Sequence, residues 1–423
     1  MDIQALHRSF ENCTCGRVHS CPVEFVEIGH GATVKIAELC RDYKKILLVS
    51  DENTYKACGK SVSDLLSEKM EKNLILRSDG KVVIPDEEKI SEIEAAITKE
   101  TDFVVGVGSG VINDLCKYVS FKNNLRYCIV ATAPSMDGYA SVGSALSLEG
   151  MKVTLNARPP MAIIADTEVL KDASFDMIQA GYGDIIGKFS CLNDWKLSNV
   201  INGEYLCEYV YNLTYEMLNN TKDLGEKLQN RDEEAIRILM EALVGVGIAM
   251  AYVGNSRPAS GSEHHLSHFF EIVGILKNEP YFMHGTDVAY SAVYTQKLRE
   301  ELLCVELPVE KDKLTREEWE KEIHRIYLGA ADGVIELQDK IKMYEKQNIG
   351  ICRNKWSEIK EVLKDSPSSE MMIEYLSSIG LDISEFKKKY GKEKINDSIL
   401  YAKDLKDRYS VLWLYYFLKG EIR

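Results

Sequence analysis

The chain has 423 residues, of which 45% are hydrophobic and 28% are charged, and its formal net charge is −14. This length and composition predict a globular protein of two domains, each with its own core. The acidic charge argues against general nucleic-acid binding, which needs a basic surface, and an anionic small substrate would need a local cationic pocket.

The cysteines and the apolar runs bear on the compartment. Eleven cysteines are scattered without regular pairing, and the N-terminus lacks the charged-then-apolar pattern of a secretion signal. We therefore expect a cytoplasmic protein whose thiols are mostly reduced. The longest apolar run, residues 243–253, contains two glycines and is too short to span a bilayer, so no membrane insertion is expected.

One N-terminal segment combines Cys13, Cys15, His19 and Cys21 in NCTCGRVHSC. Close cysteine and histidine spacing can bind zinc. Cys-x-Cys is not the usual knuckle spacing, however, and no second cysteine pair follows at finger distance. Solvated or reactive thiols are therefore the preferred interpretation, and a structural metal site is the alternative.

From residue 23 to about residue 170, apolar β-rich runs alternate with helical stretches. The predicted strands are KILLVSD (45–51), NLILRSD (73–79), DFVVGVGSG (102–110), RYCIVATAP (126–134) and MAIIAD (161–166). Helices are predicted near residues 31–42, 54–70 and 86–100. This alternation predicts a parallel sheet covered by helices, with ligands at the carboxyl ends of the strands.

The stretch GVGSGVIND (106–114) follows an apolar strand and opens a helix. Its glycines allow a close backbone approach to a phosphate, which a helix N-terminus attracts. The spacing differs from the standard dinucleotide fingerprint, because no acidic residue ends a strand about twenty residues later. Asp51 ends a strand, but it precedes the glycine loop.

A second loop, ATAPSMDGYASVGS (131–144), follows the next strand. It offers the hydroxyls of Thr132, Ser135 and Ser141 and the carboxylate of Asp137 at the same edge of the sheet. Small polar residues are common turn formers. Two such loops at consecutive strand ends favour a binding site.

Past residue 172 the strand signals stop, which predicts an α/β domain over residues 1–172 and an all-helical domain over residues 173–423. Residues 181–199 read as a helix with Asp184, Lys188, Cys191 and Trp195 along one face. Asp184 lies among apolar residues, and a buried carboxylate needs a partner such as a metal ion. Further helices are predicted at about 205–229 and 232–254.

Four of the eight histidines lie between residues 257 and 285. His264 and His268 are four residues apart and share one face of a helix, and His284 follows a short polar loop. Imidazole is a common ligand of catalytic divalent metals, and such sites combine three protein ligands with an open position. The cluster predicts a metal site whose carboxylate comes from elsewhere in the chain.

Several motifs in order resemble the iron-containing alcohol dehydrogenase and dehydroquinate synthase-like superfamily. They are GVGSGVIND, ATAPSMDGYAS, ARPPMAIIADTEVL, GYGDIIGK and SRPASGSEHHLSH, followed by the His-Gly pair at 284. Within the superfamily, residues 20–300 most resemble the sn-glycerol-1-phosphate dehydrogenases. The resemblance implies an α/β dinucleotide-binding domain followed by a helical domain.

Carried over by motif, the family's metal ligands fall on Asp184, His264 and His284, and His268 faces the substrate. The cofactor NAD(H) or NADP(H) would lie on Gly108, Ser109, Gly110, Asn113 and Asp114, with Thr132, Ser135 and Ser141 near its nicotinamide. Asp51 matches the acidic residue that binds the adenosine ribose in the family, and Asp137 matches a residue that contacts the substrate.

Two departures from the family pattern matter. Iron-dependent relatives place a further histidine one turn after the aspartate, where this chain has Lys188, so zinc or nickel becomes as plausible as iron. Ser109 replaces a common glycine, a change that should leave the phosphate turn intact.

The resemblance implies reversible reduction of dihydroxyacetone phosphate to sn-glycerol 1-phosphate, with His268 or Asp137 delivering a proton. The substrate phosphate could pair with Lys188 or with Arg257. In the alternative interpretation, Lys188 balances the charge of Asp184 and Arg257 caps a helix end. A glycerol or alcohol dehydrogenase, a dehydroquinate synthase-like enzyme and a non-catalytic metal-binding protein are the alternatives. A homodimer is expected by family likeness.

Overall fold

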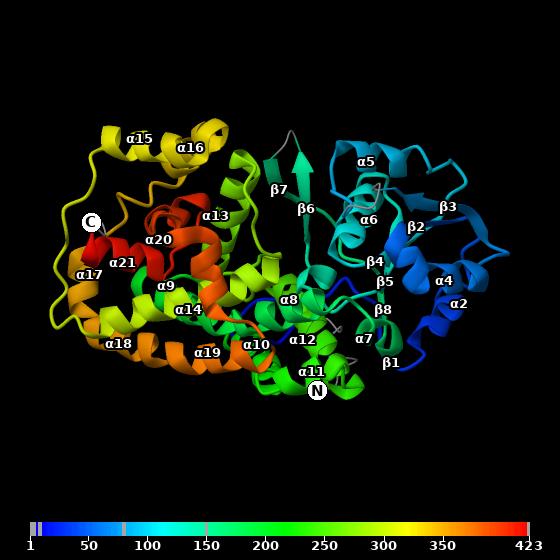
Figure 1. Cartoon of the computed structure of the whole chain (residues 1–423), viewed down its shortest axis with the longest axis horizontal. Coiled ribbons are helices and arrows are strands. Elements are labelled where there is room, and N and C mark those ends of the chain that lie inside the picture. The colour runs from blue at the N-terminus through cyan, green and yellow to red at the C-terminus, as the bar shows by residue number, and fades with distance from the viewer. Residues whose placement is uncertain (1–5, 7–10, 78–81, 149–150, 421–423) are drawn as a thin grey trace. The chain divides into compact units, whose positions relative to one another are not determined.

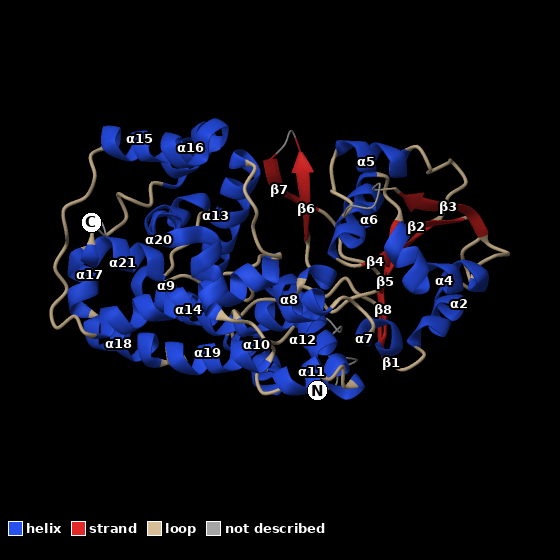
Figure 2. Ribbon diagram, in the orientation of Figure 1, coloured by secondary structure: helices blue, strands red, loops and turns tan. Residues whose placement is uncertain are grey.

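The structure is a computed structural model that describes residue 6 and residues 11–77, 82–148 and 151–420. The chain divides into two compact units, Met1–Ile185 with Asn219–Ser256 and Ile186–Leu218 with Arg257–Arg423. The domain boundary expected at residue 172 stays a prediction. Figure 2 shows that the strands belong to the first unit and that the described part of the second unit holds helices and loops.

The first unit is built on a six-stranded sheet with the order β1-β8-β5-β4-β2-β3, in which every neighbouring pair is parallel. Its strands are β1 (Phe25–Gly29), β2 (Ile46–Asp51), β3 (Met70–Leu76), β4 (Phe103–Gly108), β5 (Arg126–Ala131) and β8 (Ala162–Asp166). The predicted parallel sheet is confirmed, with a strand at each of the five predicted places, although residues 78–79 of the strand predicted at 73–79 lie outside the described residues. The edge strand β1 was not among the predicted strands.

Helices cover both faces of this sheet (Figure 1). The helical elements over residues 31–122 are η1 (Ala32–Val34), α2 (Lys35–Leu39), α3 (Glu52–Thr54), η2 (Tyr55–Gly59), α4 (Lys60–Leu65), α5 (Glu87–Glu94) and α6 (Gly110–Lys122). Ile36 and Val62 pack with Val105 and Val130 on one face of the sheet. On the other face, the Cys116 thiol of α6 lies over Gly106, where a side chain would not fit without a shift.

An antiparallel strand pair in the first unit was not predicted, whereas the helix predicted at about residues 232–254 is present as its last helix. Between β5 and β8, the strands β6 (Gly143–Leu148) and β7 (Met151–Asn156) form an antiparallel pair, preceded by η3 (Gly138–Ala140). The unit also includes α7 (Thr167–Lys171), α8 (Phe175–Ile186), α11 (Gly225–Gln229) and α12 (Glu233–Val253). Gly247 lets α12 approach η3, since a Cβ there would stand 2.9 Å from the carbonyl oxygen of Asp137.

Helix α12 is long and apolar enough to cross a membrane by length and composition. However, 78% of its most apolar window is buried inside the protein. Burial in the core of the first unit therefore accounts for its composition.

The described part of the second unit consists of helices joined by loops. Its elements are α9 (Lys188–Asn202), most of α10 (Glu208–Thr221), α13 (Ser262–Lys277), α14 (His284–Leu303), α15 (Arg316–Tyr327), η4 (Leu328–Ala330), α16 (Ala331–Ile341), α17 (Ile349–Asn354), α18 (Trp356–Lys364), α19 (Ser369–Ser378), α20 (Ile383–Tyr401), η5 (Ala402–Leu405) and α21 (Val411–Lys419). The predicted sequence of an α/β region followed by a helical region is confirmed.

A buried ion pair joins four helices of the second unit. The Arg299 guanidinium of α14 donates to Asp194 Oδ1 of α9 at 2.8 Å, and both side chains are fully buried. The same carboxylate accepts from the backbone N–H groups of Ser262 and Val411, at the starts of α13 and α21. Because both carboxylate oxygens of Asp194 accept hydrogen bonds, one of them from the first residue of α13, the ion pair fixes where α13 begins and therefore where its histidines lie.

All eleven cysteines lie in the described part of the chain, and none of them forms a disulfide there.

Candidate active site

Three of the predicted cofactor residues lie at the carboxyl ends of neighbouring strands. Asp51 ends β2, Gly108 ends β4, and Thr132 follows β5. In the register of the sheet, Gly108 of β4 pairs with Ala131 of β5, and Ser50, just before Asp51, pairs with Val107. The strand order changes direction between β2 and β4, because β3 continues outward from β2 while β4 and β5 lie on its other side. Such a switch point creates a crevice at the carboxyl ends, where parallel sheets bind ligands.

The glycine loop follows β4, at this switch point, and ends at the start of α6. A Cβ at Gly108 would stand 2.5 Å from the Cβ of Ile112, so only glycine allows the close strand-to-helix turn. Ser109 is the N-cap of α6 and makes no side-chain cap hydrogen bond, and Gly110 is the first residue of the helix. The backbone N–H groups of this first turn can therefore receive an anionic group.

Asn113 and Asp114 lie in the first two turns of α6 and hold the neighbouring loop. The Asn113 amide donates to the Gly138 carbonyl at 3.3 Å and accepts from the Tyr127 hydroxyl. The Asp114 carbonyl oxygen accepts from Ser144 Oγ at 2.6 Å. Both residues thus position the loop that follows β5, in addition to the cofactor role expected for them.

A buried lysine at this site was missed from the sequence. Lys117 Nζ donates to the carbonyl oxygens of Gly138 and Gly143, each at 2.9 Å, and lies 3.3 Å from Asp114 Oδ1. Burial lowers the pKa of Lys117 below its usual value, against the opposing effect of Asp114. Its position one turn after Asp114 on the predicted helix was the available signal.

The three predicted hydroxyl residues of the loop after β5, Thr132, Ser135 and Ser141, have different surroundings. Thr132 is buried, and its backbone N–H donates to the Gly108 carbonyl at 3.1 Å, which joins the two loops. Ser135 is also buried, in the loop between β5 and η3. Ser141 Oγ donates within the loop to the carbonyl oxygens of Gly138 and Gly143 and lies 3.2 Å from Lys117 Nζ. Ser141 therefore maintains the shape of the loop.

Asp184 lies near the end of α8 and is fully buried. Its Oδ2 accepts a hydrogen bond from the backbone N–H of Asp137 at 3.0 Å, so α8 and the second loop are joined at the two acidic positions. Gly181, one turn earlier, makes this approach possible, since a Cβ there would stand 1.8 Å from the Pro134 carbonyl oxygen.

The second unit gathers the three predicted histidines. The ring centroids of His264 and His284 are 5.1 Å apart, those of His268 and His284 are 5.3 Å apart, and those of His264 and His268 are 6.2 Å apart. His264 and His268 lie one turn apart on α13, and His284 is the first residue of α14. Asp184 belongs to the other unit, so its membership of the same metal site stays a prediction.

The orientation of His264 is set by a neighbouring glutamate that was not among the predicted site residues. His264 Nδ1 lies 2.7 Å from Oε1 of Glu263, which is fully buried and also accepts from the Gly261 N–H at 2.8 Å. A carboxylate on Nδ1 places the proton there and leaves Nε2 as the coordinating nitrogen, as is usual for metal-bound histidines. The adjacent position of Glu263 in SEHH was the available signal.

A second ligand set also exists around His284. His268, Glu271 and His284 offer ligand atoms that all lie within 4.8 Å of one another. Burial lowers the pKa of His268 well below its usual value, aided by Lys406 and opposed by Glu271. His268 is therefore neutral near pH 7, which suits either a metal ligand or a proton carrier.

The two candidate phosphate partners have different surroundings. Lys188 is fully buried at the start of α9, and its Nζ donates to the Ala259 carbonyl at 3.0 Å. Arg257 makes a two-bond ion pair with Glu204, at 2.9 and 2.8 Å, and donates to the Tyr409 carbonyl at 2.7 Å. These bonds give Arg257 a structural role in the second unit.

Donor types and glycine positions fit a divalent metal and a dinucleotide. Imidazole with carboxylate suits zinc, nickel or iron, and the open first turn of α6 beside Gly108 suits a pyrophosphate. Asp51 Oδ1 accepts from the N–H groups of Asn53 and Thr54, both at 2.8 Å. These two bonds end on one carboxylate oxygen, so they are compatible with a ribose contact through the other.

Comparison with known proteins identifies related sequences. A model of the family described as iron-containing alcohol dehydrogenase matches residues 27–174. A glycerol-1-phosphate dehydrogenase (NAD(P)+) of Geobacillus thermodenitrificans is 35% identical over 286 residues, covering 66% of this chain and 71% of the relative. One from Bacillus licheniformis is 30% identical over 421 residues, covering 97% and 93%. One from Methanosarcina barkeri is 33% identical over 301 residues, covering 68% and 82%.

Solved structures share the fold at much lower identity. A sulfoacetaldehyde reductase from Bifidobacterium kashiwanohense in complex with NAD+ matches with a TM-score of 0.60 and 13% identity, over 96% of this chain and 99% of that one. An iron-containing alcohol dehydrogenase from Thermococcus thioreducens matches with a TM-score of 0.59 and 14% identity, over 94% and 98%. At these identities the likeness concerns the fold alone.

Proposed function

Because the chain belongs to the glycerol-1-phosphate dehydrogenase family, we propose that it catalyses the reversible reduction of dihydroxyacetone phosphate to sn-glycerol 1-phosphate with NADH or NADPH. The substrate is inferred from the family to which the chain belongs. The local support is a glycine turn at the point where the strand order changes direction in the first unit and a histidine cluster in the second. The reaction would supply the glycerol phosphate backbone for lipid synthesis.

The first unit would hold the dinucleotide. We propose that the pyrophosphate lies on the first turn of α6, at Gly108, Ser109 and Gly110, because unpaired N–H groups and the helix dipole favour an anion there. Asp51 would accept hydrogen bonds from the adenosine ribose. The loop that follows β5, with Thr132, Ser135 and Ser141, would line the nicotinamide.

Asp184, His264 and His284 would hold one divalent ion. When bound, the metal would act as a Lewis acid on the substrate carbonyl. Glu263 would keep His264 in the coordinating tautomer through its bond to Nδ1. The backbone N–H of Asp137 would keep the Asp184 carboxylate in a fixed rotamer.

The reduction places a hydride on the carbonyl carbon and a proton on the carbonyl oxygen. The cofactor supplies the hydride, and the protein must supply the proton. His268 is neutral near pH 7, so we propose that it relays a proton rather than starting as an imidazolium. Asp137 is the second candidate, through a hydroxyl or a water molecule.

Lys188 would bind the substrate phosphate. Lys188 is fully buried, its Nζ donates to the Ala259 carbonyl, and an ammonium group makes charge-assisted hydrogen bonds with phosphate oxygens. The net charge of −14 means that such a contact must be local. We further propose a cytoplasmic enzyme that acts as a homodimer and does not bind nucleic acid.

A coupled assay tests the proposal. Metal-free protein is reconstituted separately with Zn²⁺, Ni²⁺ and Fe²⁺, and NADH oxidation is followed with dihydroxyacetone phosphate and with dihydroxyacetone. We expect metal-dependent turnover with the phosphorylated ketone and a product that an sn-glycerol-3-phosphate-specific enzyme does not oxidise. Equal efficiency with dihydroxyacetone or glycerol would instead favour a glycerol dehydrogenase.

A further inference from the structure

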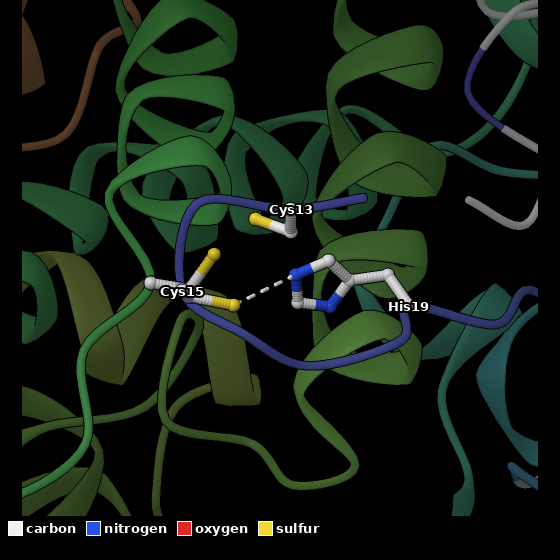
Figure 3. Close-up of side chains that lie close together, drawn as sticks. Cys13, Cys15 and His19 are labelled. Atoms are coloured by element: carbon white, nitrogen blue, oxygen red, sulfur yellow. Dashed lines mark hydrogen bonds between the residues drawn. The ribbon is translucent and has the colours of Figure 1, made fainter. Parts of the chain in front are cut away.

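The N-terminal loop brings two cysteines and a histidine together outside the proposed active site (Figure 3). Cys13 to Gly16 form a tight turn, in which the Gly16 N–H donates to the Cys13 carbonyl at 2.9 Å. Gly16 has a φ of +75°, a conformation that favours glycine. This turn allows the side chains of Cys13 and Cys15 to face the same space although they are only two residues apart.

His19 closes the group from the other side of the loop and is fully buried. Its Nδ1 lies 2.9 Å from the Tyr252 carbonyl oxygen in the last turn of α12. A carbonyl only accepts hydrogen bonds, so in the neutral ring Nδ1 carries the proton and Nε2 carries the lone pair. Nε2 faces Cys15 Sγ at 3.4 Å, which is the orientation that metal-bound histidines adopt.

The distances fit tetrahedral coordination. Bonds of about 2.3 Å from zinc to sulfur and about 2.0–2.1 Å to nitrogen, meeting at the tetrahedral angle, place sulfur and nitrogen about 3.5 Å apart. The ligand atoms of Cys13, Cys15 and His19 all lie within 4.8 Å of one another, and the Cys15–His19 separation is 3.4 Å. A thiol–imidazole hydrogen bond has a similar length, so metal content must decide between the two.

We propose that Cys13, Cys15 and His19 bind a thiophilic divalent ion of the Zn²⁺ class, at a structural site separate from the proposed catalytic metal. Two thiolates and a neutral imidazole balance the charge of a divalent ion and leave a fourth position for a further donor. The ion would anchor the N-terminal loop to the end of α12, where His19 also satisfies one of the last carbonyl groups of the helix. This site does not depend on the proposed function.

The third cysteine of the segment provides a matched control. Cys21 Sγ faces the Val23 carbonyl oxygen at 3.8 Å, and Cys21 is not part of the cluster of ligand atoms. We therefore expect Cys21→Ser to leave metal binding intact. Cys304→Ser, at an exposed cysteine of the second unit, controls for the loss of a thiol elsewhere.

Cobalt substitution gives a readout that the catalytic site does not produce. Metal-free, fully reduced protein is titrated with Co²⁺, and thiolate-to-cobalt charge-transfer absorption in the near ultraviolet is recorded. The proposed catalytic ligands are oxygen and nitrogen atoms, so this absorption reports thiolate ligands alone. We expect its intensity at saturation to correspond to one thiolate-bound cobalt ion in the wild type, Cys21→Ser and Cys304→Ser, and the absorption to vanish in the Cys13→Ser/Cys15→Ser double variant.

The zinc content of zinc-loaded protein should agree with the cobalt titration. The double variant should lose one equivalent of zinc relative to the wild type and retain its dehydrogenase activity below its unfolding temperature. The wild-type spectrum decides the question even if the double variant fails to fold. Absence of charge-transfer absorption in the reduced wild type, or its persistence in the folded double variant, would overturn the proposal.

Discussion

The buried carboxylate of Asp184 accepts a hydrogen bond from the backbone N–H of Asp137, 3.0 Å from its Oδ2. This bond joins α8 to the loop after β5, the two places where the sequence carries GYGD and PSMDG. It requires the helix to approach the loop closely, and Gly181 permits that approach.

We expect Gly181→Ala to destabilise the protein and to reduce turnover. A Cβ at this position would stand 1.8 Å from the Pro134 carbonyl oxygen, a backbone atom that cannot rotate away. Overpacking of this kind costs about 1–3 kcal/mol or more, so the melting temperature should fall and Asp184 should be displaced. Gly333→Ala in α16, with nothing within 4 Å of the new Cβ, is the control and should be neutral or mildly stabilising.

We expect Asp51 to favour NADH over NADPH, because a carboxylate at the ribose repels a 2′-phosphate. Asp51→Ser should shift the ratio of kcat/KM values towards NADPH by up to about tenfold, equivalent to about 1.4 kcal/mol. Serine can also replace Asp51 as the N-cap of α3, so the change should not unfold the turn. Equal efficiency of the wild type with both cofactors would remove the basis for this prediction.

The sequence predicted the parallel sheet because its strands are buried on both faces. Strands such as Phe103–Gly108 and Ala162–Asp166 then read as continuous apolar runs between helical stretches. The hairpin Gly143–Leu148 with Met151–Asn156 carries serine, lysine, threonine and asparagine among its apolar residues and follows a loop rich in glycine and serine. Its short strands gave no comparable signal.

Site residues were predictable where a local motif marks them. His264 and His268 share a helix face by their spacing alone, and the glycine turn at Gly108 is visible in the sequence. Asp194 was not predictable in this way, because its partners Ser262, Arg299 and Val411 lie more than sixty residues away in the chain, and Lys117 offered only its spacing from Asp114, because the carbonyl groups that it binds lie more than twenty residues away. Such buried charges become recognisable only when the fold brings their partners together.

The histidine cluster contains two overlapping ligand sets, and metal analysis of single variants separates them. If Asp184, His264 and His284 hold the ion, Asp184→Asn and His264→Ala should lose one metal equivalent and all activity. His268→Ala should keep the metal and lose turnover. Glu271→Gln should also keep the metal, whereas loss of the ion in that variant would favour the set of His268, Glu271 and His284.

The partner of His264 gives a graded test of the same assignment. Glu263→Gln removes the carboxylate from Nδ1 without changing the size of the side chain. Loss of such a partner typically weakens metal binding about 10–100-fold. Competition with a chelator should reveal this shift in the affinity for the ion, and an unchanged affinity would exclude His264 as a ligand.

A surface histidine makes a small pH-dependent contribution to stability. His30 Nδ1 lies 2.9 Å from Glu233 Oε1, and this hydrogen bond raises the pKa of His30 above its usual value. The contribution is complete below the unfolded pKa of about 6.5 and is lost as the pH rises through the folded value. The melting temperature of His30→Gln should therefore fall below that of the wild type at about pH 6 and match it at about pH 8.5.

Lys188 provides the sharpest test of a phosphorylated substrate. Lys188 is a fully buried cation four residues after Asp184 in the sequence, and its Nζ donates to the Ala259 carbonyl. A charge-assisted bond to phosphate is worth about 1.5–3 kcal/mol, or roughly ten- to a hundredfold in an equilibrium constant. We expect Lys188→Met to raise the KM for dihydroxyacetone phosphate by that factor and to leave the KM for NADH and the low activity on dihydroxyacetone nearly unchanged. Arg257→Met is the comparison, because breaking its ion pair with Glu204 should lower the melting temperature without a selective change in KM. If Lys188→Met impaired both ketones equally, the lysine would serve the packing of α9 and the phosphate would bind elsewhere.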